Sequence, residues 1–305
     1  MTKLLFDTGT CAIQQLESER FAERGVAVAV LRIDKIHAIV SGNKLFKLHY
    51  FLQEAMASAH KTVLTFGGAY SNHLAATAFA CRALGLQSIG IVRGEAAAAL
   101  SPTLQQCILW GMQLKFVSRE QYRAQPAVAF ITQLKREFGD CSLIPEGGYH
   151  AMGAYGAALI MQQFDKEKYS HVCTAVGTAT TLAGLALGCN DEQQVVGYPV
   201  LKGMEDIDER LSYLTNDHEK LQQITIRKDY HFEGYAKKND VLLNFMNACW
   251  QQHQLPLDFV YTAKMLYGVV EDIGKGFYPP GSSILCMHTG GLQGNNSLPP
   301  GTLLY

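Results

Sequence analysis

Residues 171–187 read HVCTAVGTATTLAGLAL, which predicts a strand, a short turn and a helix in direct succession. The apolar run His171–Val176 has the length and β-branched content of a strand that is buried on both faces. Gly177 and the small hydroxyl residues after it mark the turn, and Thr181–Leu187 has the composition of a helix. A strand that passes through a tight turn into a helix is the repeating unit of α/β proteins.

The same alternation continues on both sides of this segment. We expect further strands at Val26–Ile33, Thr62–Phe66, Ser88–Val92, Gln113–Val117, Ser142–Ile144, Gln194–Tyr198, Leu257–Val260 and Ser283–Met287. We expect helices at Asn72–Leu84, Thr103–Trp110, Gln121–Phe138, Gly153–Phe164, Asp240–His253 and Lys264–Gly274. This pattern predicts an α/β fold with parallel sheets covered by helices. The 305 residues suffice for one large or two medium domains, and no linker separates them, so two domains would lie closely apposed.

Composition argues against several kinds of partner. Apolar residues make up 48% and charged residues 17% of the chain, and the formal net charge of −1 favours neither nucleic acid nor a membrane surface. No apolar run approaches the roughly 18 residues of a membrane span, and MTKLLFDTGT at the start does not have the pattern of a secretory signal. The eight cysteines include no C-x-x-C pair, and the histidines form no H-E-x-x-H motif. We therefore expect a cytoplasmic protein with reduced thiols and no metal site.

Three glycine-rich turns follow predicted strands: Gly67–His73, Gly177–Thr181 and His288–Gly291. They are candidate ligand sites, because ligands of open α/β sheets bind beyond the carboxyl ends of the strands. In the second turn, small residues, hydroxyls and a helix N-terminus suit a phosphate group, although a tight packing turn would have the same composition. It lacks both the lysine of a P-loop and the G-x-G-x-x-G pattern of a dinucleotide site.

Ser71, Asn72 and Lys44 each have an ordinary interpretation beside a functional one. Ser71 or Asn72 could cap the next helix, or point polar groups into a cleft. The flanking glycines of a G-x-S-x-G nucleophile are missing around Ser71. Lys44 follows Gly-Asn at an expected helix start, with Lys47 three residues on. It could be a solvated surface charge, or an amine whose lowered pKa allows it to form imines.

Five short motifs in a fixed order carry a resemblance to one family. They are S-G-N-K-x-x-K-L from Ser41, G-G-x-x-S-N-H from Gly67, G-x-x-x-T-x-A-G from Gly177, V-Y-T-x-K from Val260 and H-T-G-G from His288. Together they resemble the branch of fold-type II pyridoxal 5'-phosphate (PLP) enzymes that contains D-cysteine desulfhydrase and 1-aminocyclopropane-1-carboxylate (ACC) deaminase. The resemblance runs from about Arg32 to Gly291, which is most of the chain.

This resemblance implies a fold, a cofactor and an assembly. The fold is similar to that of the tryptophan synthase beta chain: two domains, each an open, mostly parallel, twisted sheet flanked by helices, with the active site in the cleft between them. Residues 1–43 and 157–305 would form the larger, PLP-binding domain. Residues 44–156 would form the smaller domain, which carries the Ser71-Asn72 turn. The resemblance implies PLP as cofactor, a small amino acid as substrate and a homodimer as assembly.

The resemblance also implies a role for each matched residue. Lys44 would carry PLP as a Schiff base, with Lys47 near its phosphate. Asn72 would hydrogen-bond the 3'-oxygen of PLP, and Ser71 would lie near the substrate carboxylate or the proton being moved. The phosphate cup would consist of Gly177, Thr178, Ala179, Thr180 and Thr181. Tyr261 matches a tyrosine close to the cofactor ring, Tyr235 looks like a second active-site tyrosine, and the remaining cofactor-binding candidates are Thr262 and Thr289.

The implied reaction is β-elimination from D-cysteine, which gives pyruvate, ammonia and sulfide. ACC deaminases resemble one another in having Glu after the tyrosine and Leu after the histidine, where this chain has Thr262 and Thr289. One of these threonines would meet the pyridine nitrogen, with Thr289 the first choice, or both could simply be buried and satisfied by backbone bonds. The alternatives are an ACC deaminase giving 2-oxobutyrate and ammonia, a catalytically altered PLP-binding homologue, and a nucleotide-binding α/β protein. Phe46 and Tyr70 depart from the usual Arg and Gln of the family, which bears on the substrate.

Overall fold

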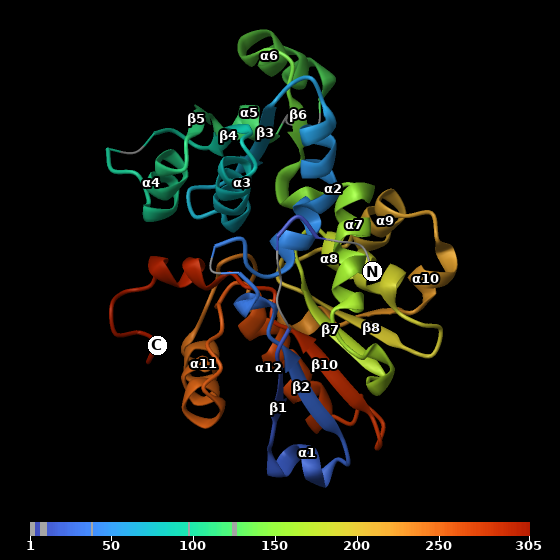
Figure 1. Cartoon of the computed structure of the whole chain (residues 1–305). Coiled ribbons are helices and arrows are strands. Elements are labelled where there is room, and N and C mark those ends of the chain that lie inside the picture. The colour runs from blue at the N-terminus through green and yellow to red at the C-terminus, as the bar shows by residue number, and fades with distance from the viewer. Residues whose placement is uncertain (1–3, 7–10, 38, 97, 124–126) are drawn as a thin grey trace.

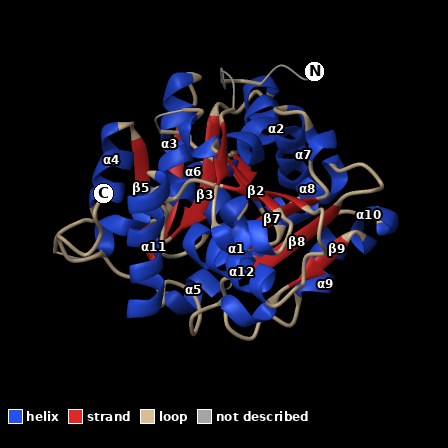
Figure 2. Ribbon diagram, turned by 90° about the horizontal axis from the view of Figure 1, so that it is seen from below, coloured by secondary structure: helices blue, strands red, loops and turns tan. Residues whose placement is uncertain are grey.

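The structure, a computed structural model, describes residues 4–6, 11–37, 39–96, 98–123 and 127–305. It confirms the α/β prediction: two separate sheets are flanked by helices (Figure 1). In that view the smaller sheet lies in the upper half of the molecule and the larger sheet in the lower half, and helices surround both (Figure 2). Most of the N-terminal stretch MTKLLFDTGT lies outside the described residues. No helix within the described ranges is long and apolar enough to cross a membrane.

The larger sheet has six strands in the order β1-β2-β10-β7-β8-β9. β1 runs antiparallel to β2, and the other neighbouring strands are parallel. The central strands β7 and β10 are almost entirely buried, which is expected for a parallel sheet covered on both faces. The six strands are β1 (Ile13–Leu16), β2 (Ala27–Leu31), β7 (His171–Val176), β8 (Gln194–Pro199), β9 (Ile224–Ile226) and β10 (Ser283–Met287).

The smaller sheet has four parallel strands in the order β5-β4-β3-β6. Its strands are β3 (Thr62–Gly67), β4 (Gln87–Arg93), β5 (Met112–Val117) and β6 (Ser142–Ile144). The helices that follow its strands are α3 (Asn72–Ala83), α4 (Pro102–Leu109), α5 (Arg119–Arg123) and α6 (Val128–Phe138).

Helix α2 (Asn43–Ala57) packs against α7 (Ala151–Ala158), and α7 also packs against α8 (Thr180–Gly188), which follows strand β7 of the larger sheet. The largest apolar cluster runs through these helices, so it connects the two sheets. The remaining helices of the described chain are α1 (Glu19–Glu23), α2 (Asn43–Ala57), α7 (Ala151–Ala158), α8 (Thr180–Gly188), α9 (Ile207–Leu214), α10 (His218–Gln222), α11 (Asp240–His253) and α12 (Thr262–Gly274).

The predicted strand Leu257–Val260 is wrong. The Asp258 carboxylate accepts hydrogen bonds from the backbone N–H groups of Val260, Tyr261 and Thr262, which curls the chain directly into α12. The side chains of this segment are nevertheless buried, and this explains its strand-like apolar pattern.

Other element predictions need smaller corrections. The predicted helix Gln121–Phe138 consists of α5 and α6, and its residues 124–126 lie outside the described part of the chain. The predicted helix Gly153–Phe164 is α7 followed by a 3-10 turn at Leu159–Gln162. The sequence prediction also misses the short edge strands β1 and β9.

The two sheets draw on different parts of the chain. The larger one uses strands between residues 13 and 31 and between 171 and 287, and the smaller one uses strands between 62 and 144. The domain boundaries 1–43 with 157–305, and 44–156, stay a prediction; they fall at the start of α2 and inside α7.

Candidate active site

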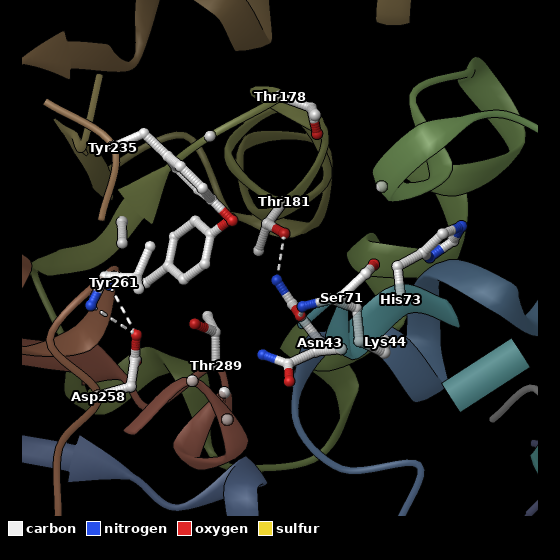
Figure 3. Close-up of a pocket in the computed structure, with 18 of the residues that line it drawn as sticks. Asn43, Lys44, Ser71, His73, Thr178, Thr181, Tyr235, Asp258, Tyr261 and Thr289 are labelled. Atoms are coloured by element: carbon white, nitrogen blue, oxygen red, sulfur yellow. Dashed lines mark hydrogen bonds between the residues drawn. The ribbon is translucent and has the colours of Figure 1, made fainter. Parts of the chain in front are cut away.

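One cavity of about 520 Å³ collects the three glycine-rich turns singled out in the sequence (Figure 3). Its walls come from the carboxyl ends of strands in both sheets, which is where ligands of open α/β sheets bind. Of the residues predicted for the site, all but Thr262 line it: Lys44, Lys47, Ser71, Asn72, Gly177, Thr178, Ala179, Thr180, Thr181, Tyr235, Tyr261 and Thr289.

Lys44 is placed by the chain that leads from β2 into α2. Gly42 has a φ of 65°, and a Cβ there would lie 2.0 Å from the carbonyl oxygen of Thr289, so this close approach needs a glycine. Asn43 Nδ2 donates to Thr181 Oγ1 at 2.8 Å, and Lys44 Nζ donates to Asn43 Oδ1 at 2.7 Å. Through Asn43, these two bonds connect the Lys44 amine to Thr181 of the threonine-rich turn (Figure 3).

The amines of Lys44 and Lys47 share this cavity. Burial lowers the pKa of Lys44 to about 8, although the Asp258 carboxylate opposes the shift. Burial and the neighbouring Lys44 hold the pKa of Lys47 well below its usual range. Burial, Lys47 and Lys44 together lower the pKa of His73 to about 3, so this imidazole is neutral. The lining contains four basic side chains, Lys44, Lys47, Arg93 and Arg210, against the two carboxylates of Glu146 and Asp258, so the cavity suits an anion.

The threonine-rich turn wraps around the N-terminus of α8. Ala179 has a left-handed φ of 65°, and the hydroxyls of Thr178 and Thr180 are 2.9 Å apart. Gly177 lies under the ring of Tyr261, since a Cβ on Gly177 would lie 3.2 Å from a carbon of that ring. Hydroxyl groups and the positive end of a helix thus face the cavity together, which is the arrangement expected for a phosphate cup.

The sequence allowed Ser71 and Asn72 either to cap the next helix or to point polar groups into a cleft, and the structure distinguishes these roles. Ser71 is the N-cap of α3, because its Oγ accepts a hydrogen bond from the N–H of Leu74 at 3.2 Å, and it also lines the cavity. Asn72 Oδ1 is buried without a hydrogen-bond partner. This amide is therefore left to bind a ligand in the cavity.

Tyr261 and Tyr235 stand against each other, with ring centroids 6.1 Å apart and planes at 71° (Figure 3). Burial raises the pKa of Tyr261 well above its usual range, and the adjacent Tyr235 adds to the rise. Thr289 lines the cavity, whereas the fully buried Thr262 donates its hydroxyl to Asp258 Oδ2 at 2.6 Å. Of the two threonines, Thr289 is the one that faces the cavity.

Several lining residues were not identified from the sequence. Asp258 lies in the stretch mistaken for a strand, and Arg93 ends β4. Arg210 comes from α9 and is paired with Asp206 at 2.7 Å. Asn43 and His73 are direct neighbours of predicted residues, so position next to a motif was a usable signal for these two.

The residues of the cavity fit PLP. Two buried amines and the hydroxyl-lined helix start match a phosphate and an aldehyde, and the buried, unpartnered Asn72 oxygen marks an amide that is free to meet the ring. An Asn side chain can present either its oxygen or its nitrogen at such a position.

Comparison with known proteins agrees with this fit. The profile described as pyridoxal-phosphate dependent enzyme matches residues 16–290. A provisionally named ACC deaminase of Pyrococcus abyssi is 32% identical over 289 residues, which cover 89% of this chain and 86% of that protein. The D-cysteine desulfhydrase of Serratia proteamaculans is 27% identical over 287 residues, which cover 88% and 87%. The crystal structure of an ACC deaminase homologue superimposes with a TM-score of 0.80 at 27% identity, over 96% of this chain and 93% of that one.

The family match spans nearly the whole chain. It includes all of the predicted site residues that line the cavity. This chain therefore belongs to the family of pyridoxal-phosphate-dependent enzymes, and its cofactor is PLP.

Proposed function

We propose that this protein catalyses β-elimination from D-cysteine or a close relative, giving pyruvate, ammonia and sulfide. The observation that carries the proposal is the Lys44 amine, which is connected through Asn43 to Thr181 in a cavity that suits an anion. When bound, PLP supplies an electron sink for bonds at the α-carbon of an amino acid.

Lys44 would form the covalent link to the cofactor, and its amine, released when the substrate amine takes its place, would act as the general base. Because burial lowers its pKa to about 8, its neutral form is accessible, and it can accept the proton from the substrate Cα. Lys47 and the Gly177–Thr181 turn would hold the phosphate. The Asn72 amide would bind the oxygen of the cofactor ring, and Ser71 would lie near the substrate carboxylate or the proton being moved.

Tyr261 and Tyr235 act on the leaving group. Because burial raises the pKa of Tyr261, this phenol stays protonated and can donate a hydrogen bond to the departing sulfur. Tyr235, in ring contact with Tyr261, orients that hydroxyl. Such a donor lowers the barrier to breaking the carbon–sulfur bond.

Thr289 is our choice for the pyridine nitrogen, because it faces the cavity while the hydroxyl of Thr262 is bonded to Asp258. A neutral hydroxyl shares a hydrogen bond with that nitrogen and does not hold a proton on it as a carboxylate would. The similarity to a relative named D-cysteine desulfhydrase supports D-cysteine as the proposed substrate.

ACC deamination is the second candidate, favoured by the name of the Pyrococcus abyssi relative. ACC has no hydrogen on its α-carbon, so the Lys44 base could not begin the reaction in the same way. The two reactions also release different products, which makes them separable in one assay.

The test supplies the purified, PLP-loaded protein with D-cysteine, L-cysteine, D-serine and ACC in turn. We expect sulfide and pyruvate from D-cysteine, and no 2-oxobutyrate from ACC. The Lys44→Ala variant with added PLP is the control for the slow reaction of free PLP with cysteine. Release of 2-oxobutyrate without sulfide would replace the proposal by the second candidate, and bound cofactor without any turnover would point to a catalytically altered homologue.

We also propose a homodimer in the cytoplasm, and the division into domains at residues 43/44 and 156/157. The eight cysteines are all free thiols, which supports a reducing compartment. The dimer rests on the family resemblance, and light scattering of the purified protein tests it.

A further inference from the structure

Lys264 is a buried amine near the start of α12, and its bonds go to one turn. Its side chain is fully buried, and Nζ donates to the carbonyl oxygens of His231 at 2.9 Å and Gly234 at 2.6 Å. Burial lowers the pKa of Lys264 to about 8, and the Asp258 carboxylate opposes this. A buried amine destabilises a fold unless its bonds compensate, so the two bonds to this turn explain why an amine is kept there.

The turn that Lys264 contacts has an uncommon backbone. Phe232, Glu233 and Ala236 have φ values of 49°, 65° and 54°, and Gly234 has 119°. Side chains other than glycine rarely adopt such values, and they keep them only where the surroundings enforce them. The carbonyl of Gly234 inside this turn and that of His231 directly before it are bonded to Lys264, which supplies that restraint.

Tyr235 is the residue that this turn presents to the cavity. Half of Tyr235 is exposed, yet its ring packs edge-on against Tyr261 at 6.1 Å (Figure 3). Lys264 follows Tyr261 by three residues, so the start of one helix places both partners of this ring contact. Tyr261 is placed directly by the chain, and Tyr235 is placed through the Lys264 amine.

We propose that Lys264 is a positioning residue that holds the 232–236 turn so that the Tyr235 hydroxyl stays beside Tyr261. The inference rests on the proposed function, in which these two tyrosines act on the leaving group. Lys264 is not one of the described residues that line the cavity. It therefore acts through the turn and not on the substrate. Its removal frees two carbonyls and lets the backbone relax away from Tyr261. The Lys44 amine and the Gly177–Thr181 turn keep their own bonds.

The test is a double-mutant cycle on the PLP-loaded protein, with kcat and KM for D-cysteine measured for Lys264→Met, Tyr235→Phe and the double variant. We expect each single change to lower kcat at least about tenfold. The double variant should be no slower than the slower single variant, since Lys264 acts through Tyr235. The visible absorbance of the bound cofactor should be unchanged in all of them. Effects that multiply, or a kcat of Lys264→Met within about twofold of the parent, would overturn the proposal.

Lys275→Met is the matched control. It removes a lysine at the other end of the same helix, where Nζ contacts the Tyr230 hydroxyl at 3.1 Å, and it leaves the 232–236 turn untouched. Its kcat should equal that of the parent. Lys264→Gln, which keeps an amide donor, should recover part of the kcat lost in Lys264→Met; no recovery, with both variants folded, would count against the bonds to the turn as the cause.

Gly234→Ala keeps the inference testable if Lys264→Met does not fold. An added Cβ meets nothing closer than 3.5 Å, so this change strains the turn at a φ of 119° while Lys264 stays in place. The Gly234→Ala variant should have a lower kcat, and combining it with Tyr235→Phe should lower kcat no further than the slower single change. An unchanged kcat would show that the turn does not control the position of Tyr235. If the parent protein gives neither cofactor absorbance nor product, the proposed function fails and the inference with it; if the parent is active and Lys264→Met matches it, the inference alone fails.

Discussion

Lys44 and Lys47 bring two amines into one cavity, and their neighbours set what each can do. Asp258 partly compensates the burial of Lys44, whereas Lys47 feels burial and the neighbouring Lys44, both of which lower its pKa. An anion bound at the α8 N-terminus would stabilise the protonated form of Lys47. We therefore propose that Lys44 is the neutral, nucleophilic amine and that Lys47 would carry the charge that meets a phosphate.

The lowered pKa of Lys44 predicts how attachment of the cofactor depends on pH. Below about 8 the amine is mostly protonated in the cofactor-free protein and cannot attack an aldehyde. The rate of reconstitution should therefore rise about tenfold per pH unit below that value and level off above it. Stopped-flow absorbance after addition of PLP measures the rate. Free N-acetyl-lysine, the control, should keep rising to about pH 10, and a protein profile that follows the free amine would contradict the burial argument.

Arg93 predicts how the substrate carboxylate is recognised. It ends β4 beside the Gly68–Ser71 turn, since a Cβ on Gly68 would lie 3.6 Å from Arg93 Nη2. None of the ion pairs formed among the described residues involves it. Arg93→Gln should raise KM for D-cysteine about tenfold with little change in kcat, because a charge-assisted hydrogen bond is lost.

D-cysteine amide provides the comparison for this prediction, because it lacks the carboxylate. Its KM should be the same in the parent and in Arg93→Gln. Arg82→Gln removes another guanidinium near the smaller sheet, one that contacts the Leu109 carbonyl and not the cavity, and should leave both KM values unchanged. Equal shifts for the acid and the amide would show that Arg93 does not read the carboxylate.

Local motifs were sufficient to predict the part of the site that lies in short contiguous stretches. Lys44, Ser71 and the Gly177–Thr181 turn each sit in a run of glycine and small polar residues, whose backbone shape is set locally. Asp258 and Arg93 could not be found in this way. Their place in the cavity depends on which strands are neighbours, and neither lies in a run of that kind.

The start of helix α2 illustrates how one element fixes the site. Gly42 touches the His288–Gly291 turn, and Asn43 and Lys44 follow it into the cavity. The orientation of the Lys44 amine therefore depends on backbone contact between two turns that are distant in sequence.

Gly42→Ala should damage both stability and cofactor binding. The added Cβ would lie 2.0 Å from the Thr289 carbonyl oxygen at a φ of 65°, so the two turns must move apart. We expect the free energy of unfolding to fall by about 3 kcal/mol. Chemical denaturation measures this loss, and absorbance measures the loss of bound cofactor.

Gly85→Ala is the matched comparison. Gly85 has a similar φ of 69°, but a Cβ there meets nothing within 4 Å. The Gly85→Ala change should lower the free energy of unfolding by the backbone strain alone, about 1 kcal/mol, and leave cofactor binding intact. If both variants lost the same stability, contact between the turns would not be what requires glycine at position 42.

Elements with a strong apolar pattern were predicted well, and the errors have local causes. Strands β3, β7 and β10 are buried on both faces, and their continuous apolar runs are clear in the sequence. β1 and β9 are edge strands of four and three residues, too short to show a period. Leu257–Val260 failed because the Asp258 side chain competes for the backbone N–H groups that a strand would use.

At the level of the whole chain, the sequence predicted parallel sheets, and the family resemblance implied two of them, but not the order of their strands. Alternation of strands and helices predicts parallel sheets, yet β10, the last strand, lies between β2 and β7 in the larger sheet. This pairing joins segments more than a hundred residues apart, and no local pattern specifies it. It also brings the His288–Gly291 turn beside Gly42, so the topology completes the cavity.

The proposed function requires that the Lys44 amine, and not that of Lys47, binds the cofactor aldehyde. Borohydride reduction of the PLP-loaded protein, followed by proteolysis and fragment mass spectrometry, locates the attachment directly. We expect the reduced pyridoxyl group on Lys44, with Lys47 unmodified. Modification of Lys47 or of any other lysine, with Lys44 unmodified, would contradict it.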